Sequence, residues 1–251
     1  MKVLQIAEQR IQIENLYPYM EEYGKEYFIS GEEYGPIDTR VVITREDIDF
    51  ERRKSEQEDR TEGIPVCSFS DEYLEILAVY RKIAEWMPKQ NTVLFHGSVV
   101  AVDQKGYLFT AKSGTGKSTH TRLWREMMKE RAVMINDDKP LLKIKKKERT
   151  GEKEVRAYGT PWDGKHRLST NCSVPLRGIC ILHRAESNRI QRIDKQRAYP
   201  VFLQQVYRPR EKQSMERTLA LLDEIFDLVP VYELFCNMEL DAAKTAYEGM
   251  I

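Results

Sequence analysis

The chain has 251 residues, and its 40 lysines and arginines balance 40 aspartates and glutamates, so its formal net charge is zero. This balance does not favour nucleic acid or a membrane surface as the main partner, and an anion site must come from local geometry. No apolar run approaches the roughly 18 residues of a membrane span, and Met1–Arg10 lacks the features of a signal peptide. We therefore expect a cytoplasmic protein without a nucleic-acid or membrane partner.

The first 90 residues are predicted to form a small β-rich lobe that ends in a helix. The run Arg45–Glu62 is dense in mixed charge and poor in apolar residues, so we expect an exposed loop or hairpin tip. A docking surface for a partner is the alternative reading. Apolar residues at helical spacing predict a core helix over Glu72–Trp86. Turn-formers such as Tyr34-Gly35-Pro36 separate four short candidate strands: Val3–Ala7, Arg10–Ile13, Tyr27–Ser30 and Thr39–Thr44.

Residues 91–251 alternate strands with helices, which predicts an α/β domain with a mixed sheet and flanking helices. The predicted helices begin near Lys117 and cover Ala198–Val206, Met215–Leu228 and Leu240–Glu248. The predicted strands are Val93–Val102, Tyr107–Thr110, Ala132–Ile135, Leu141–Ile144, Val155–Tyr158, Gly178–Leu182 and Val231–Phe235. The four cysteines, which are widely separated and predict free thiols, are Cys67, Cys172, Cys180 and Cys236.

The segment Ala111–Ser118 reads AKSGTGKS and matches the Walker A phosphate-binding pattern, except that Ala111 replaces the first glycine. Alanine is acceptable there if the position needs no positive φ. Glycines in such a loop let backbone N–H groups surround a phosphate, and the following helix directs its positive end at the same place. The predicted nucleotide contacts are Ser113, Gly114, Thr115, Gly116, Lys117, Ser118 and Thr119, with Lys117 on the β- and γ-phosphates and Ser118 on Mg²⁺.

Two adjacent acids follow the predicted strand that comes one helix after this loop. Asp137 and Asp138 end the run AVMINDD, and we expect that strand to lie directly beside the strand before the Walker A loop. One carboxylate is predicted to hold Mg²⁺, and the other to accept the proton of an attacking hydroxyl. The order of the two roles stays open, and a plain Asp- and Asn-rich turn is the alternative.

Two further segments carry candidate site residues. His96 stands in an apolar strand shortly before the Walker A loop, where a core histidine is the ordinary reading. The segment Gly159–Arg167, GTPWDGKHR, is bounded by glycine and is aromatic and basic. Lys165 and Arg167 are candidates to clamp a transferring phosphoryl group, and a rigid connecting loop is the equal alternative. Arg184 is a weaker candidate of the same kind.

With these motifs in hand, the chain resembles the HPr kinase and ATP-type phosphoenolpyruvate carboxykinase superfamily, and most of all small HPr kinase-related proteins. The resemblance rests on the order of three segments, namely His96-Gly97-Ser98, the run GYLFTAKSGTGKSTHTRLW and the run INDDKP. It implies a P-loop α/β fold, ATP and Mg²⁺, and it suggests a multimer. It also places His96, Asp137 and Asp138 at the reaction centre. HPr itself is not implied as substrate, because the family's glycine-rich segment with Glu and Arg is replaced by GTPWDGKH and the N-terminal region does not match the regulatory domain.

We therefore expect an ATP-dependent kinase that transfers the γ-phosphoryl group to a hydroxyl, either a serine of a protein or peptide or a small molecule. Two alternatives remain. One is an ATP-binding sensor without catalysis, whose output surface would be Arg45–Glu62. The other is a phosphoenolpyruvate carboxykinase-like enzyme, although such enzymes are about twice this length.

Overall fold

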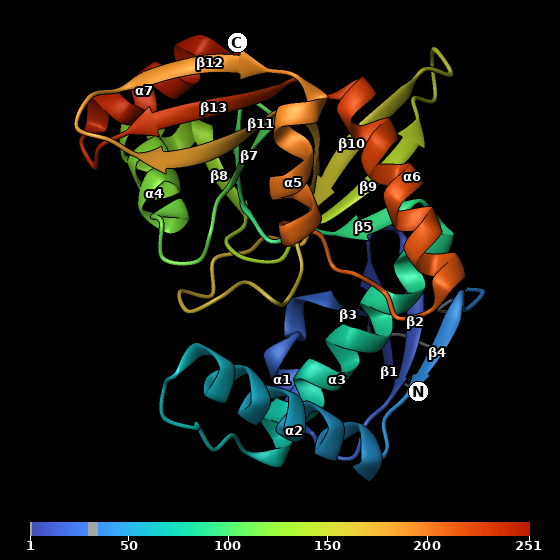
Figure 1. The fold of residues 1–251 in the computed structure, drawn as a ribbon. Coiled ribbons are helices and arrows are strands. Elements are labelled where there is room, and N and C mark those ends of the chain that lie inside the picture. Colours follow the sequence, from blue (N-terminus) through green and yellow to red (C-terminus); the bar gives the residue numbers. More distant parts are fainter. Residues whose placement is uncertain (1, 30–34) are drawn as a thin grey trace. The chain divides into compact units, whose positions relative to one another are not determined.

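The computed structural model describes residues 2–29 and 35–251 and divides the chain into two compact units, Met1–Glu85 and Trp86–Ile251. The division lies within one helix, whereas the sequence placed the boundary after residue 90. The structure has mixed α/β architecture with a small β-sheet lobe, as the sequence predicts (Figure 1). All four cysteines are free thiols, as expected. None of the helices in the described ranges combines the length and the apolar character that crossing a membrane requires.

The first unit contains a four-stranded sheet in the order β3-β1-β2-β4. A tight turn through Ala7 and Glu8, both with positive φ, joins β1 to β2, and β4 runs parallel to β2. The predicted strand Tyr27–Ser30 is reduced to β3, and Ser30 and Tyr34 lie outside the described residues. The elements before the first long helix are β1 (Lys2–Ile6), β2 (Gln9–Glu14), α1 (Tyr19–Tyr23), a 3₁₀ turn (Lys25–Tyr27), β3 (Phe28–Ile29) and β4 (Thr39–Val42).

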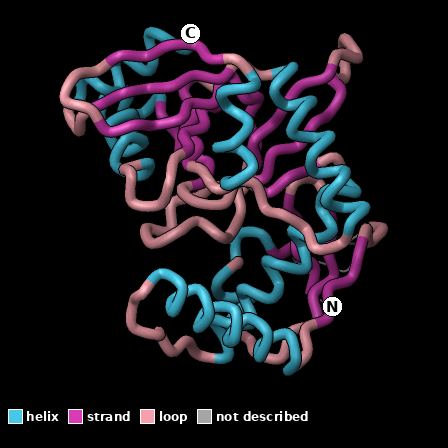
Figure 2. The backbone as a smooth tube through the Cα atoms, in the orientation of Figure 1, coloured by secondary structure: helices cyan, strands magenta, loops and turns pink. Residues whose placement is uncertain are grey.

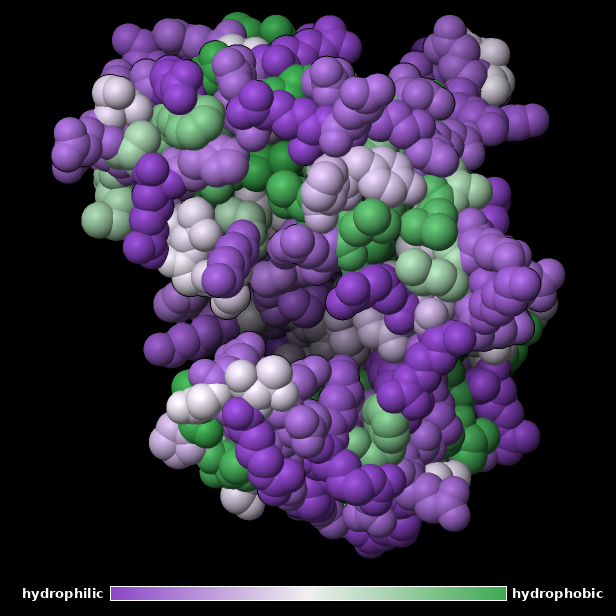
Figure 3. All heavy atoms as spheres, viewed as in Figure 1, coloured by the Kyte–Doolittle hydropathy of each residue, from purple (hydrophilic) through white to green (hydrophobic). Residues whose placement is uncertain are grey.

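The prediction of an exposed loop at Arg45–Glu62 is wrong, because this segment is the 18-residue helix α2. Its start has a capping box, in which Thr44 and Asp47 satisfy each other's backbone N–H groups, and its end has Gly63 in the left-handed region at φ 70°. The helix buries little, and the face of the molecule in Figure 3 is mostly hydrophilic. Local capping and helix-favouring charged residues therefore form an element that the low apolar content does not predict.

Helix α2 is held to helix α3 (Asp71–Trp86) by charge pairs. Arg81 on α3 binds Asp47 at 2.9 Å and also pairs with the buried carboxylate of Glu51. Lys82 binds the second oxygen of Asp47 at 2.6 Å. Burial alone would raise the pKa of Asp47, but hydrogen bonds from Lys82, Arg81 and Thr44 outweigh it and lower the pKa to about 2.

The second unit is built on a nine-stranded mixed sheet, whose strands are drawn in magenta in Figure 2. Its main path runs β5-β9-β10-β11-β7-β6-β8. The long strand β11 pairs antiparallel with β10 near its start and parallel with both β7 and β13 further along, and β12 pairs with β13. The strands are β5 (Thr92–Leu94), β6 (Ser98–Val102), β7 (Lys105–Thr110), β8 (Ala132–Asn136), β9 (Leu141–Lys146), β10 (Lys153–Tyr158), β11 (Ser173–Arg184), β12 (Arg189–Ile193) and β13 (Val231–Cys236).

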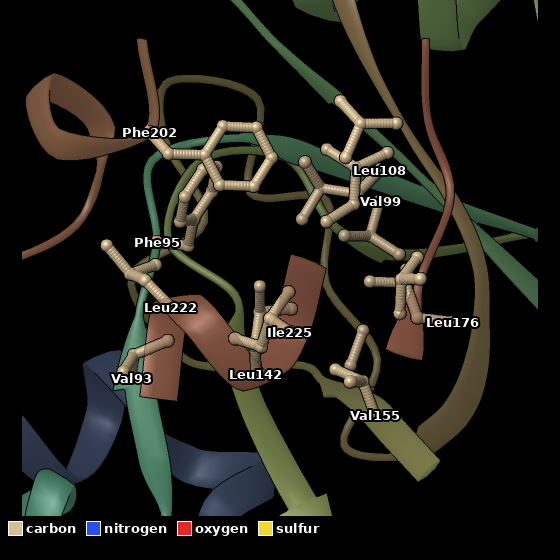
Figure 4. Packing of buried hydrophobic residues seen from close by; sticks show 14 of the residues in the cluster. Val93, Phe95, Val99, Leu108, Leu142, Val155, Leu176, Phe202, Leu222 and Ile225 are labelled. Carbon is tan, nitrogen blue, oxygen red and sulfur yellow. The ribbon is translucent and has the colours of Figure 1, made fainter. Parts of the chain in front are cut away.

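Helices cover both faces of this sheet, so its central strands are apolar on both sides. Leu108, Ile179 and Ile181 share one core with residues of α5 and α6, including Phe202, Leu222 and Ile225, and Figure 4 shows part of this cluster. The alternate residues Tyr107 and Phe109 belong to a second core with α4 and α7. The helices are α4 (Lys117–Met128), α5 (Lys195–Gln205), α6 (Lys212–Leu228) and α7 (Leu240–Met250), with 3₁₀ turns at Met87–Gln90 and Lys129–Arg131.

The predicted strand Val93–Val102 is in fact two strands, β5 and β6, which lie in different parts of the sheet. Residues 95–97 form the break, and their backbone N–H groups donate to carbonyls outside β5 and β6. Phe95 donates to the carbonyl of Pro140, His96 to that of Gln205, and Gly97 to that of Asp138. The continuous apolar run concealed this break, because both strands are buried.

Candidate functional site

A glycine loop, residues Ala111–Gly116, connects the central strand β7 to helix α4. Gly114 and Gly116 have φ values of +76° and +122°, which L-residues rarely adopt. Ala111 is not among the residues with positive φ, which explains why alanine is tolerated where the Walker A pattern has glycine. No side chain in the described parts of the chain caps α4, so its first backbone N–H groups are available to an anion or to water.

Lys117, the first residue of α4, reaches back over this loop. Its Nζ donates a hydrogen bond to the carbonyl of Ala111 at 3.2 Å, and the side chain is largely buried. Burial lowers the pKa of Lys117, while the negative charges of Asp138 and Asp137 act to raise it. The two acids therefore lie within electrostatic range of this ammonium group.

Arg184, at the end of β11, supports the glycine loop from its other side. Its Nε donates to the carbonyl of Thr115 at 3.1 Å, and its Nη2 donates to the carbonyl of Gly114. The guanidinium of Arg184 thus binds the backbone carbonyl oxygens of the loop. These oxygens are hydrogen-bond acceptors and cannot themselves bind phosphate.

The acids reach the site by a different route from the one predicted. Strand β8 does not lie beside β7, because β6 lies between them. Both β7 and β8 are antiparallel to β6, so they run in the same direction and end at the same side of the sheet. The strand beside β7 is β6, which forms a hairpin with it. The number of residues between strands in the sequence does not reveal this arrangement.

Asp137 follows β8 and is almost fully buried, at 5% exposure. The hydroxyl of Ser98, the first residue of β6, donates to its Oδ1 at 2.7 Å and lies 3.1 Å from the hydroxyl of Thr121 on α4. The Thr121 hydroxyl also contacts the carbonyl oxygens of Lys117 and Ser118 at 3.3 Å. A short polar chain therefore connects Asp137 to the first turn of α4.

Asp138 points to a different set of partners. Its Oδ1 lies 3.2 Å from Nε2 of His96 and 3.3 Å from Nζ of Lys139. Burial would raise the pKa of Asp138, but the hydrogen bond from His96 and the charge of Lys139 outweigh it and lower the pKa. The His96 ring is 25% exposed, so it is not the enclosed core histidine of the ordinary reading.

Asn136 holds the acidic turn in place and was not among the predicted site residues. It is fully buried, and its Oδ1 accepts from the backbone N–H groups of Asp138 at 2.9 Å and Lys139 at 2.6 Å. Its Nδ2 donates to the carbonyl and hydroxyl oxygens of Thr160, both at 3.0 Å. An Asn side chain that bonds the backbone two residues later is a known turn signal, so the pattern Asn-Asp-Asp offered a way to find it.

The segment Gly159–Arg167 lies against this acidic turn. A Cβ on Gly159 would lie 2.0 Å from the carbonyl oxygen of Thr170, so only glycine fits. A Cβ on Gly164 would approach the Cβ of Asp138 to 3.1 Å, which places this part of the segment beside the acid. The segment is therefore part of the site's wall.

The two basic candidates in this segment have different surroundings. Arg167 lies 2.8 Å from Oδ1 of Asp163 and donates to the carbonyl of Pro161 at 2.8 Å. Lys165 is exposed, and no hydrogen bond or ion pair joins it to Asp137 or Asp138 in the described structure. The structure thus brings together His96, Lys117, Asp137 and Asp138 but does not bring Lys165 or Arg167 to the acids.

Asp163 is a third carboxylate near the site. It is buried and accepts a hydrogen bond from Ser169 at 2.8 Å. Burial raises its pKa, and the charge of Asp137 adds to this effect, whereas Ser169 and Arg167 act to lower it. Its distance from solvent and its bonded partners make it a support for the wall.

The donors present suit a hard cation that is shared with phosphate. Among the described residues, no three His, Cys, Asp or Glu side chains form a group that could hold a metal, and no cationic side chain forms an ion pair with Asp137. Magnesium is commonly bound by one or two carboxylates, a hydroxyl and substrate phosphates rather than by a complete protein cage. The buried oxygens of Asp137 and the partly exposed Ser118 fit such a site.

Comparison with known proteins adds little to what the geometry of the site shows. No protein-family model and no curated protein matches the chain. A solved structure of the Hpr(Ser) kinase/phosphatase from Coxiella burnetii matches with a TM-score of 0.35 and 11% identity, over 62% of this chain and 94% of that one. Nothing about the chemistry of this chain follows from a similarity of this size.

Proposed function

We propose that the second unit is an ATP-dependent kinase whose glycine loop is a P-loop and which transfers the γ-phosphoryl group to a hydroxyl. The observation that carries this proposal is the meeting of two features at one side of the sheet. One is the positive-φ loop with Lys117 and uncapped helix N–H groups, and the other is the pair Asp137 and Asp138. Phosphoryl transfer requires a cation and backbone amides at the phosphates, together with carboxylates that face them.

In this proposal the two acids have separate roles. Asp137 and Ser118 would hold Mg²⁺, because the hydroxyls of Ser98 and Thr121 link Asp137 to the turn that carries Ser118. The metal would neutralise charge on the β- and γ-phosphates. Asp138 would accept a hydrogen bond from the acceptor hydroxyl. It is ionised at neutral pH, as an ordinary aspartate is, and because His96 and Lys139 lower its pKa it would take the proton only as the new bond to phosphorus forms.

The transfer step exchanges one oxygen–phosphorus bond for another. The acceptor oxygen forms a bond to the γ-phosphorus while the bond from that phosphorus to the bridging oxygen of ADP breaks. The proton of the acceptor hydroxyl passes to Asp138, whose position His96 fixes at 3.2 Å. Lys117 and the loop N–H groups stabilise the charge on the phosphates, and Lys165, which is exposed on the wall segment, approaches an anionic substrate. Arg167 acts through Asp163 as a support of that segment.

The test uses Asp137→Asn and Asp138→Asn, each assayed for Mg²⁺-ATP binding and for transfer of γ-labelled phosphate to acceptors in a cell extract. We expect Asp138→Asn to retain ATP binding and to lose at least about 10²-fold in transfer. We expect Asp137→Asn to lose the magnesium dependence of binding. Full transfer by both variants would overturn the assignment. ATP binding by the wild type without transfer to any acceptor would favour a nucleotide sensor instead.

A further inference from the structure

Ser98 stands where strand β6 begins, directly beside the acidic turn, and its side chain is fully buried. Main-chain bonds fix the backbone on both sides of it. The N–H group of Gly97 donates to the carbonyl of Asp138 at 3.0 Å, and Val99 pairs with the last residue of β8. The Ser98 hydroxyl is therefore held in one place relative to the acids.

The direction of the hydrogen bonds around Ser98 follows from its partners. A carboxylate oxygen only accepts, so the Ser98 hydroxyl donates its one proton to Oδ1 of Asp137, at 2.7 Å. The Thr121 hydroxyl, 3.1 Å away, is then the donor to the Ser98 oxygen. Ser98 is 0% exposed, Thr121 1% and Asp137 5%, so water does not compete for these bonds.

The two carboxylate oxygens of Asp137 have different surroundings. Oδ1 accepts the bond from Ser98, whereas no hydrogen bond or ion pair reaches Oδ2 within residues 2–29 and 35–251. The described residues do not fully enclose Oδ2 either, so it keeps contact with solvent. A cation can therefore reach Asp137 through Oδ2 while Ser98 holds Oδ1.

We propose that Ser98 is a positioning residue that keeps Asp137 a one-oxygen ligand and thereby makes the site select Mg²⁺ over Ca²⁺. The inference rests on the proposed function, in which Asp137 and Ser118 hold the metal of the nucleotide. Mg²⁺ requires nearly ideal octahedral geometry, whereas the larger Ca²⁺ accepts roughly six to eight oxygens and can take both oxygens of one carboxylate. A donor fixed on Oδ1 favours binding through one oxygen and opposes binding through two.

The experiment compares the dissociation constants of Mg²⁺-ATP and Ca²⁺-ATP by isothermal titration calorimetry. We expect the wild type to bind Mg²⁺-ATP more tightly. Ser98→Ala frees Oδ1, and the preference for Mg²⁺-ATP should narrow by about tenfold, the lower end of the loss that follows when a group orienting a metal ligand is removed. Ser98→Thr keeps the hydroxyl and should keep the preference. A purely structural defect would weaken both chelates equally and leave the preference unchanged.

Thr121→Val tests the same chain of hydroxyls from helix α4 and preserves the shape of the side chain. Ser98 then loses its own donor, so we expect the preference to narrow by about threefold. Thr218→Val is the matched control. Thr218, on α6, is also 1% exposed, and its hydroxyl likewise contacts the carbonyl four residues earlier, that of Ser214 at 2.8 Å. It should keep the wild-type preference.

The melting temperature of each variant shows that it is folded, and Thr121→Val carries the test if Ser98→Ala does not fold. Two results with the variants would overturn the inference: an unchanged preference in folded Ser98→Ala or Thr121→Val, or an equal change in Thr218→Val. A wild type that binds both chelates equally would also overturn it, while the proposed function stands. A wild type that binds neither chelate would remove the proposed function and the inference together, so the two failures are distinguishable.

Discussion

Two loops of the second unit meet near the same acids and use their polar groups in opposite ways. The glycine loop leaves the N–H groups at the start of α4 uncapped, and its carbonyls are held by Arg184. The wall segment Gly159–Arg167 has polar groups that bond within the protein, since Asn136 binds Thr160 and Ser169 binds Asp163. The comparison indicates that the first loop is shaped for a ligand and the second for support.

The largest effect is expected from Lys117→Met, which removes the cation of the open loop. Transfer of labelled phosphate should fall by at least about 10²-fold, since a positioned charge at the transferring group is lost. The free energy of unfolding should not fall, because burial already disfavours the charged form of Lys117. Lys105→Met, an exposed position at the start of β7, is the matched control and should transfer normally. Normal transfer by Lys117→Met would show that the loop is not a phosphate site.

Asn136→Ala removes a side chain that holds the wall segment and leaves the glycine loop unchanged. It removes four hydrogen bonds of a fully buried side chain, and we expect the free energy of unfolding to fall by about 3 kcal/mol. Urea unfolding followed by circular dichroism measures this. A loss below about 1 kcal/mol, within the range of ordinary surface substitutions, would show that the wall segment is held by other contacts.

A charge pair in the first unit allows a pH test of the helix that the sequence reasoning missed. The pKa of Asp47 is about 2 in the folded chain and 3.8 as an ordinary value, so its ion pairs stabilise the fold above pH 4 and lose that contribution as the pH falls toward 2. Asp47→Asn should cost about 1 to 2 kcal/mol at pH 7, because solvent screens part of the interaction, and only a small part of that at pH 2. A difference between the two proteins that is the same at pH 7 and pH 2 would contradict the assignment.

The smallest effect is expected at Arg184, where the open loop is supported. Arg184→Lys replaces a two-point contact with Gly114 and Thr115 by a single ammonium, so we expect ATP binding to weaken by about threefold to tenfold. The residue is exposed, which limits the effect. Titration calorimetry with Mg²⁺-ATP measures it, and an effect as large as that of Lys117→Met would mean that Arg184 touches phosphate directly.

Apart from helix α2, the sequence predicted the long elements that depend on local pattern and missed features that depend on long-range pairing. The α/β alternation, the helix after the glycine loop and the three later helices follow from periodicity and agree with the structure. The polar strand β12 was missed, because its few apolar residues do not predict a strand and its backbone pairing with β13 stabilises it. The same cause explains why β8 was placed beside β7, because only the sheet order reveals β6 between them.

The candidate site follows the same division. Asp137 and Asp138 were selected as candidates because adjacent acids after a buried strand are visible in the sequence. Their different surroundings, Ser98 for one and His96 for the other, arise from the break between β5 and β6 and were not predictable. Helix α2 was missed for a local reason, since composition was weighed there and the capping residues Thr44 and Asp47 were not.

The most direct measurement is a crystal structure of the full chain with Mg²⁺ and a non-hydrolysable ATP analogue. We expect the β- and γ-phosphates within hydrogen-bond distance of the N–H groups of Gly114–Ser118 and of Lys117 Nζ. We also expect the metal between Ser118 and Asp137, with Asp138 open toward the γ-phosphate. An analogue bound away from the glycine loop, or acids turned from its phosphates, would contradict the kinase assignment.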